Sequence, residues 1–262
     1  MPRKPPNDTS DPDIIDLGAL AGKRNFDSYY THPYTGEPDI PFFNFLSGKG
    51  NQSALVVVGS ENSEDIIMSA HDDLADMGGG DDIAVGGPGN DTISGGDGRD
   101  FIFGDTDLGL GDVAWKLDDV LNGDAGDDLI VGDSPNLFET AAGGDDTLNG
   151  GTGNDTLWGD GVLWDEASGG ADWFVFGSAD GNDVIMDFHT ADGDKIVLDD
   201  EMAWIILAAS KNGSLDESDT FVQIVDGSTL IDLGEASGSG AGEHTLLVEG
   251  VVGLGFDDFL FV

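Results

Sequence analysis

A nine-residue repeat rich in glycine and aspartate fills the middle of the chain and limits its fold more than any other feature. Each unit has six turn-forming residues followed by three of β character. The clearest copies are GGPGNDTIS (86–94), GGDGRDFIF (95–103), GDAGDDLIV (123–131) and GGTGNDTLW (150–158), with weaker ones at MGGGDDIAV (77–85) and AAGGDDTLN (141–149). Units this short predict a solenoid in which every coil packs on its neighbours.

The aspartate at the sixth position of the repeat gives the register. These aspartates recur nine residues apart within three groups, which are Asp73 to Asp100, Asp119 to Asp128, and Asp146 to Asp155. The stretches between the groups, and the one after the last, open with Gly-Asp, and we interpret them as degenerate turns within one winding; they are 104–118, 132–140 and 159–167. The solenoid is therefore expected to run from about residue 60 to residue 176.

Stacking of the repeats predicts cation sites. If two units form one coil, aspartates that lie two repeats apart meet on the same edge, which pairs Asp73 with Asp91, Asp82 with Asp100, and Asp128 with Asp146. Two carboxylates this close repel each other unless a cation lies between them. Calcium accepts six to eight oxygen ligands in irregular geometry, whereas magnesium requires a strict octahedron. We therefore expect several Ca²⁺ ions and poor replacement by magnesium.

The candidate calcium ligands are the sixth-position aspartates and the backbone of the turns. The aspartates are Asp73, Asp82, Asp91, Asp100, Asp119, Asp128, Asp146, Asp155 and Asp172. The turn positions are Gly78, Gly80, Gly86, Gly87, Gly89, Gly95, Gly96, Gly98, Gly123, Ala125, Gly126, Gly144, Gly150, Gly151 and Gly153. An aliphatic core between two sheets is expected from Ile83, Ile93, Ile102, Leu121, Ile130, Leu148 and Leu157.

The charge of the chain favours cations as partners and disfavours anions. Asp and Glu number 53 against 9 Lys and Arg, a net charge of −44. Nucleic acid and anionic membrane surfaces need a basic patch and are poor partners.

Cysteine is absent, so disulfides and thiolate sites are excluded. No apolar run is long enough to span a membrane, and we expect ALVVVG (54–59) and AWIILAA (203–209) to be buried strands.

The repeat resembles that of the RTX (repeats-in-toxin) calcium-binding family. This resemblance implies an all-β fold, a right-handed parallel β-roll that stays unfolded in the calcium-poor cytosol and folds outside the bacterial cell. Three stretches look like the segment that closes such rolls: GGADWFVF (169–176), GNDVIMDF (181–188) and GDKIVL (193–198). This likeness implies a last calcium at Asp187 and Asp194. The last part of the sequence resembles an uncleaved C-terminal signal read by type I secretion machinery, in the stretches TLIDLG (229–234), HTLLVEGV (244–251) and DDFLFV (257–262). The opening MPRKPPNDTS has no apolar core of the kind that a signal peptide requires, which agrees with that route.

These features divide the chain into three predicted segments. They are an N-terminal cap or docking segment (1–59), the calcium-binding roll (60–176), and a β-rich C-terminal cap with the secretion signal (177–262).

The expected function is structural rather than catalytic. The chain contains no H-E-x-x-H zinc motif and no G-x-S-x-G nucleophile elbow. We expect a secreted protein that acts at a surface, in extracellular matrix or in adhesion, through self-association or binding of surface polysaccharide. The alternatives are a small RTX-linked enzyme, a membrane-active RTX protein, and a glycan-binding module that uses Trp158, Trp164 and Trp173, of which Trp173 is expected in the core.

Overall fold

The computed structural model describes residues 13–16, 43–44, 54–105, 117–137, 142–163, 167–177, 180–198, 206, 210, 214–237, 240, 242 and 244–261. Most of the predicted N-terminal segment 1–59, and Trp164, lie outside these residues. Of the predicted strand 203–209 only Ile206 is described, and it is buried in a helical conformation.

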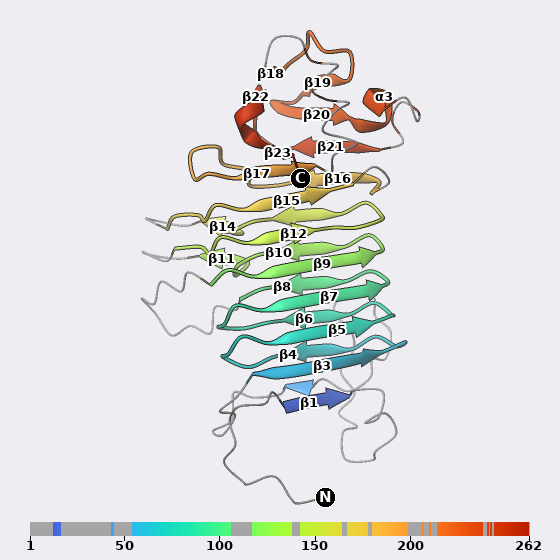
Figure 1. The fold of residues 1–262 in the computed structure, drawn as a ribbon, viewed down its shortest axis with the longest axis vertical. Coiled ribbons are helices and arrows are strands. Elements are labelled where there is room, and N and C mark those ends of the chain that lie inside the picture. Colours follow the sequence, from blue (N-terminus) through green and yellow to red (C-terminus); the bar gives the residue numbers. More distant parts are fainter. Residues whose placement is uncertain are drawn as a thin grey trace, which may run out of the picture.

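The chain winds between two sheets, so that each coil adds one strand to each of them (Figure 1). Within the described residues, sheet 1 has nine strands, all in parallel register. In order they are β1 (Asp13–Asp16), β3 (Leu55–Ser60), β5 (Leu74–Gly78), β7 (Thr92–Asp97), β9 (Val120–Ala125), β12 (Thr147–Asn149), β15 (Trp173–Phe176), β17 (Lys195–Leu198) and β23 (Phe259–Phe261).

Sheet 2 contains ten strands in the described part of the chain. Its parallel strands are β2 (Phe43–Asn44), β4 (Asp65–Ile67), β6 (Ile83–Val85), β8 (Phe101–Phe103), β10 (Leu129–Val131), β13 (Thr156–Trp158), β16 (Asn182–Ile185) and β21 (Thr245–Val248). Two antiparallel strands end it, β20 (Ser228–Asp232) and β19 (Val222–Val225). The fold is therefore a parallel β-roll, as predicted.

The length of a coil changes along the roll. In sheet 1, Leu74 pairs with Thr92, which lies two repeats later, whereas the next coil, from Thr92 to its partner Val120, is longer. From β3 to β17, nearly all of the added residues lie between a strand of sheet 2 and the next strand of sheet 1, on the side of the roll where β11 (Asn136–Leu137) and β14 (Val162–Leu163) lie in Figure 1. We call this side the interrupted edge and the opposite side the tight edge. The insertions are thus part of one winding, as predicted.

Two of the insertions add a small side sheet to the interrupted edge. β11 (Asn136–Leu137) pairs in parallel with β14 (Val162–Leu163), one coil farther on. The main ladders continue without a break beside it. β3 runs across the predicted boundary at residues 59–60, and β15, which ends at the predicted boundary at residue 176, pairs with β17 beyond it, while the three-segment division itself stays a prediction.

The core is a column of aliphatic side chains at the eighth position of the repeat. Six of the seven predicted core residues are fully buried: Ile93, Ile102, Leu121, Ile130, Leu148 and Leu157. The prediction for the remaining one, Ile83, is wrong. Ile83 occupies position seven of its repeat, which points outward, and Ala84 fills the core position beside Ile102. The same alternation places Phe174 in the core and leaves Trp173 46% exposed, so the prediction of a buried Trp173 is also wrong.

The C-terminal part closes the roll. Its short elements are β18 (Ser214–Leu215), β22 (Leu254–Gly255), α3 (Leu233–Ser237) and the 3-10 helix η1 (Phe256–Asp258). Buried residues Ile231, Leu246, Leu254 and Phe259 extend the core into this region. None of the described helices is long and apolar enough to span a membrane.

Candidate metal centres

The repeat aspartates form two buried columns, one along each edge of the roll. Each aspartate directly precedes a strand, except Asp183, which is the second residue of β16, so that position seven points outward, position eight enters the core, and the carboxyl group turns in at the edge. The column before sheet 1 is Asp73, Asp91, Asp119, Asp146, Asp172 and Asp194, and the column before sheet 2 is Asp82, Asp100, Asp128, Asp155 and Asp183.

One carboxylate oxygen of each aspartate joins two coils. The Asp73 backbone N–H donates to Asp91 Oδ1 (2.7 Å), and the Asp82 N–H donates to Asp100 Oδ1 (2.8 Å), so both of these predicted pairs meet. The same bond recurs along both columns, across coils of every length: Asp91 to Asp119, Asp119 to Asp146, Asp146 to Asp172, Asp172 to Asp194, Asp100 to Asp128, Asp128 to Asp155, and Asp155 to Asp183.

The predicted pair Asp128 and Asp146 is wrong. Asp128 N–H donates to Asp155 Oδ1 (2.8 Å), whereas Asp146 Oδ1 accepts from Asp119 N–H (2.7 Å) on the other edge. A spacing of two repeats connects the same edge only where the coil has no insertion. The coil is longer here, so that spacing connects opposite columns.

In eight of the eleven column aspartates the second carboxylate oxygen has no hydrogen-bond partner in the protein. Oδ2 is buried without a hydrogen bond in Asp82, Asp91, Asp100, Asp119, Asp128, Asp146, Asp155 and Asp172. A buried carboxylate oxygen left unpaired is costly, because the water that solvated it is lost without replacement. An oxygen donor of this kind fits a hard cation such as calcium. When bound, calcium would supply positive charge to these carboxylates, with Oδ2 as the group free to contact it.

The first glycine of the repeat makes room for this oxygen. A Cβ on Gly86 would overlap Asp91 Oδ2, and one on Gly95 would overlap Asp100 Oδ2. Gly123 and Gly150 meet the carboxylates of their own repeats in the same way. A side chain at this position would therefore push the carboxylate out of its place.

The other predicted glycines shape the turns and bring backbone carbonyls together. Gly87 (φ +90°) and Gly96 (φ +102°), at position two, adopt a conformation that other residues avoid. Gly78, Gly80, Gly89, Gly98, Gly126, Gly151 and Gly153 also have positive φ. Position-four glycines of successive coils stack so closely that a Cβ on Gly126 would overlap the Gly98 carbonyl oxygen. A Cβ on Gly144 would overlap the Leu117 carbonyl, and the Ala125 carbonyl accepts from Gly98 N–H (2.7 Å).

Burial raises the pKa of the column carboxyls, and like-charged neighbours raise it further. The pKa of Asp82 reaches about 9 and that of Asp91 about 8, in both cases chiefly because burial disfavours the charged form. Burial and the neighbouring Asp146 raise the pKa of Asp119 to about 10, whereas that of Asp100 reaches about 6. These shifts describe the chain without metal, where no cation offsets the charge.

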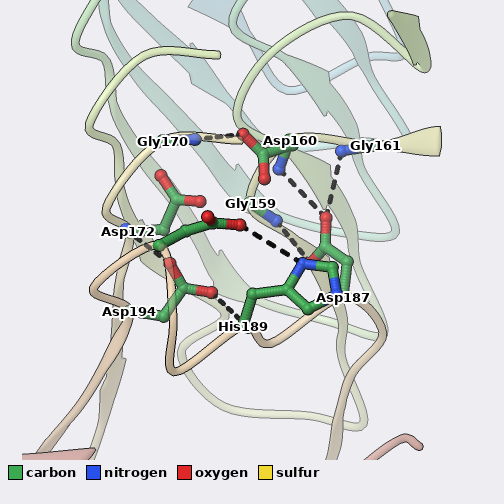
Figure 2. Close-up of polar contacts among 9 residues, drawn as sticks. Gly159, Asp160, Gly161, Gly170, Asp172, Asp187, His189 and Asp194 are labelled. Carbon is green, nitrogen blue, oxygen red and sulfur yellow. Dashed lines mark hydrogen bonds and ion pairs between the residues drawn. The ribbon is translucent and has the colours of Figure 1, made fainter. Parts of the chain in front are cut away.

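Asp187 and Asp194, where the family resemblance implies a last calcium, both accept backbone N–H groups (Figure 2). Asp187 accepts from Gly159 (2.8 Å), Asp160 (3.0 Å) and Gly161 (3.1 Å). Asp194 accepts from Asp172 (3.1 Å) and His189 (2.7 Å). Because the backbone already bonds all four of their oxygens, a calcium ion there would share these oxygens, and its presence stays a prediction.

Some buried acidic residues escaped the prediction. Asp183 is the sixth residue of a degenerate repeat, SADGNDVIM (178–186), and the signal for it is Gly181 at position four with Ile185 at position eight. Asp105, Asp133 and Asp160, the aspartates of the Gly-Asp openings, are also buried. In the part of the chain that the structure describes, no three acidic or histidine side chains gather into one cluster that could hold a metal ion.

Comparison with known proteins agrees with the repeat and its chemistry. The family model of the RTX calcium-binding nonapeptide repeat (4 copies) matches residues 78–107, 118–134 and 140–161. Among solved structures, the extracellular lipase LipA from Serratia marcescens is similar at 16% sequence identity and a TM-score of 0.33, over 85% of this chain and 42% of that one. This chain thus spans less than half of the lipase chain. No curated protein matches.

The raised pKa values predict that acid stabilises the metal-free roll. A carboxyl with a raised pKa in the folded state contributes stability that is full below its ordinary pKa of about 4. That contribution is lost as the pH rises through the folded-state values of about 6 to about 10. In calcium chelator, circular dichroism should therefore show more β structure at about pH 5 than at about pH 8. A β signal that weakens on acidification would contradict the buried, unpaired state of these groups.

A glycine substitution tests the contact between the first glycine and the carboxylate. Gly95→Ala should lower the free energy of unfolding in calcium by more than about 1 kcal/mol, because its Cβ displaces the Asp100 carboxylate. Gly79→Ala is the matched control, since its Cβ would meet no atom closer than 3.5 Å. Urea unfolding of both variants measures the difference, and equal stability would show that the contact is unimportant.

Proposed function

We propose that this chain, which carries RTX calcium-binding nonapeptide repeats, is a secreted bacterial protein that folds when it meets calcium and then serves a structural or adhesive role outside the cell. The observation that carries the proposal is the row of buried carboxylate oxygens without partners along both edges. The chain has a net charge of −44, and folding brings these carboxylates close together. Repulsion between them therefore favours the unfolded state until a bound cation offsets their negative charge.

Calcium supply makes this arrangement a switch. Extracellular calcium modules bind at about 10⁻⁴–10⁻³ M, far above cytosolic levels, so the chain would remain unfolded and exportable until it leaves the cell. A ligand that binds only the folded state stabilises it by about 2.7 kcal/mol at one hundred times its dissociation constant. Ions shared between coils would make folding cooperative, because each repeat carboxylate also contacts the preceding coil.

The outer face of sheet 1 supports an interaction role rather than catalysis. Leu74, Val120 and Trp173 stand in one outward column of the ladder and are 49%, 41% and 46% exposed. Thr92 and Thr147 lie between them in the same register. An outer face that alternates apolar side chains with threonine suits contact with a second copy or with polysaccharide, whose sugar rings stack on aromatic side chains.

Sedimentation velocity with and without calcium tests both parts of this function. We expect an expanded monomer in chelator, and a compact species in calcium that associates as its concentration rises. Leu74→Ser combined with Trp173→Ser should weaken that association or the retention on polysaccharide, whereas Val225→Ser, an equally exposed change in β19, should not. A compact species in chelator would contradict the switch. A calcium-loaded chain that neither associates nor binds polysaccharide would contradict the structural and adhesive role.

A further inference from the structure

The outer face of sheet 1 is uncharged over four neighbouring strands. Positions seven and nine of the repeat point outward there, and in β7, β9, β12 and β15 neither position holds a charged side chain. Charged side chains bound this stretch on both sides, with Asp76 in β5 and Lys195 in β17. We call the stretch the neutral face. In a chain with 53 acidic residues, a surface of this kind suits a partner that is itself uncharged.

The corresponding face of sheet 2 is apolar and shielded from solvent. Phe101 and Val131 point outward at positions seven and nine of their repeats, yet they are only 5% and 4% exposed. Trp173, at position seven in sheet 1, is 46% exposed. Sheet 1 is therefore the side of the roll on which a large partner can reach outward side chains.

Two asparagine amides on the neutral face form no hydrogen bond with the described residues. Asn122 and Asn149 pair in register at position nine of β9 and β12, and both are half-buried. Asparagines on the tight edge are used within the roll instead, since the Asn182 amide donates to Asn154 Oδ1 (3.1 Å). The two amides of the neutral face thus keep donors and acceptors for a partner.

Apolar side chains recur on this side of the roll at every second strand. Leu74, Val120 and Trp173 occupy position seven of β5, β9 and β15, with Thr92 and Thr147 on the strands between them. Strands lie about 4.8 Å apart, so these apolar side chains follow one another at roughly 10 Å. One strand spacing is close to the length of a sugar ring, and an extended β-1,4-linked glucan repeats its shape at every second ring.

These features match a neutral polysaccharide more closely than a second copy of the chain. The apolar side chains are separated by threonines, so they form no contiguous apolar patch of the kind that holds two proteins together. A sugar chain offers hydroxyl groups to Asn122 and Asn149, and the CH groups of its rings to Trp173. The net charge of −44 disfavours an anionic polysaccharide.

We propose that the neutral face binds a neutral, extended polysaccharide of the β-1,4-linked glucan class along the axis of the roll. Trp173 stacks on one sugar ring, while Asn122, Thr147 and Asn149 form hydrogen bonds with hydroxyl groups of the neighbouring rings. This proposal rests on the adhesive role proposed above and names its partner. Because the face spans several coils, it exists only when the roll is folded, so binding requires calcium.

Isothermal titration calorimetry of the calcium-loaded full chain with cellohexaose tests the proposal. The comparison ligands are maltohexaose, whose α-1,4 linkages curve the chain, and hexagalacturonate, which is anionic. Cellohexaose should bind at least about tenfold more tightly than maltohexaose, and hexagalacturonate should not bind. An affinity for either comparison ligand that equals or exceeds that for cellohexaose would overturn the proposal.

Substitutions on the face locate the site. Trp173→Ala should weaken the binding of cellohexaose by about tenfold or more, since tryptophan side chains contribute most at contacts of this kind. Asn122→Ala combined with Asn149→Ala should weaken it by a similar factor, because two hydrogen bonds are lost. Gln223→Ala combined with Val225→Ala, both exposed in β19, is the matched control and should leave the affinity unchanged. Circular dichroism in calcium checks that each variant is folded, and unchanged affinity in folded Trp173→Ala would reject the site.

Sedimentation velocity of the same samples separates this site from the proposed function. A calcium-loaded chain that associates with itself but binds no cellohexaose would overturn the polysaccharide site and leave the structural role in place. A chain that folds with calcium and does neither would overturn the structural and adhesive role together with the site.

Discussion

The buried aspartate at the sixth position of the repeat is the group on which the rest of the structure depends. Its Oδ1 accepts a backbone N–H from the preceding coil, and its Oδ2 packs without a partner on the first glycine of its own repeat, as Asp91 does with Asp73 and Gly86. The first contact fixes the register between coils, and the second requires glycine. Both keep negative charge inside the molecule, so a fold built in this way needs cations to be stable at neutral pH.

This dependence explains how the roll tolerates long insertions. The Asp82 N–H bonds an aspartate 18 residues away, and the Asp100 N–H bonds one 28 residues away, with nearly the same geometry (2.8 and 2.7 Å). The added residues form loops on one edge, and the chain after each loop makes the same aspartate-to-backbone hydrogen bond as in a short coil. Lengthening a loop costs little conformational entropy. From β3 to β16 the tight edge keeps short turns between its strands, so in this part of the roll the insertions vary the surface on one edge only.

Much of the architecture followed from the nonapeptide, because the period, the aspartate and the aliphatic position each have one physical role. The parallel roll, the pairing of Asp73 with Asp91 and the buried Ile93 and Leu121 were predictable on that basis. The pairing of Asp128 was not, because multiples of nine do not show which edge an aspartate occupies once a coil contains an insertion. Ile83 and Trp173 lie outside the core because each occupies position seven, which faces outward in the alternation of the strand, while position eight faces inward. The buried Asp133 and Asp160 carry no signal within the motif.

A calcium titration of the native chain followed by far-ultraviolet circular dichroism, with magnesium at the same concentrations as the comparison, tests the central claim most directly. The buried carboxylates predict a cooperative rise of β signal with calcium in the range of about 10⁻⁴–10⁻³ M, little response to magnesium, and reversal by chelator. A β spectrum that is already complete in chelator, or that develops equally with magnesium, would contradict the account.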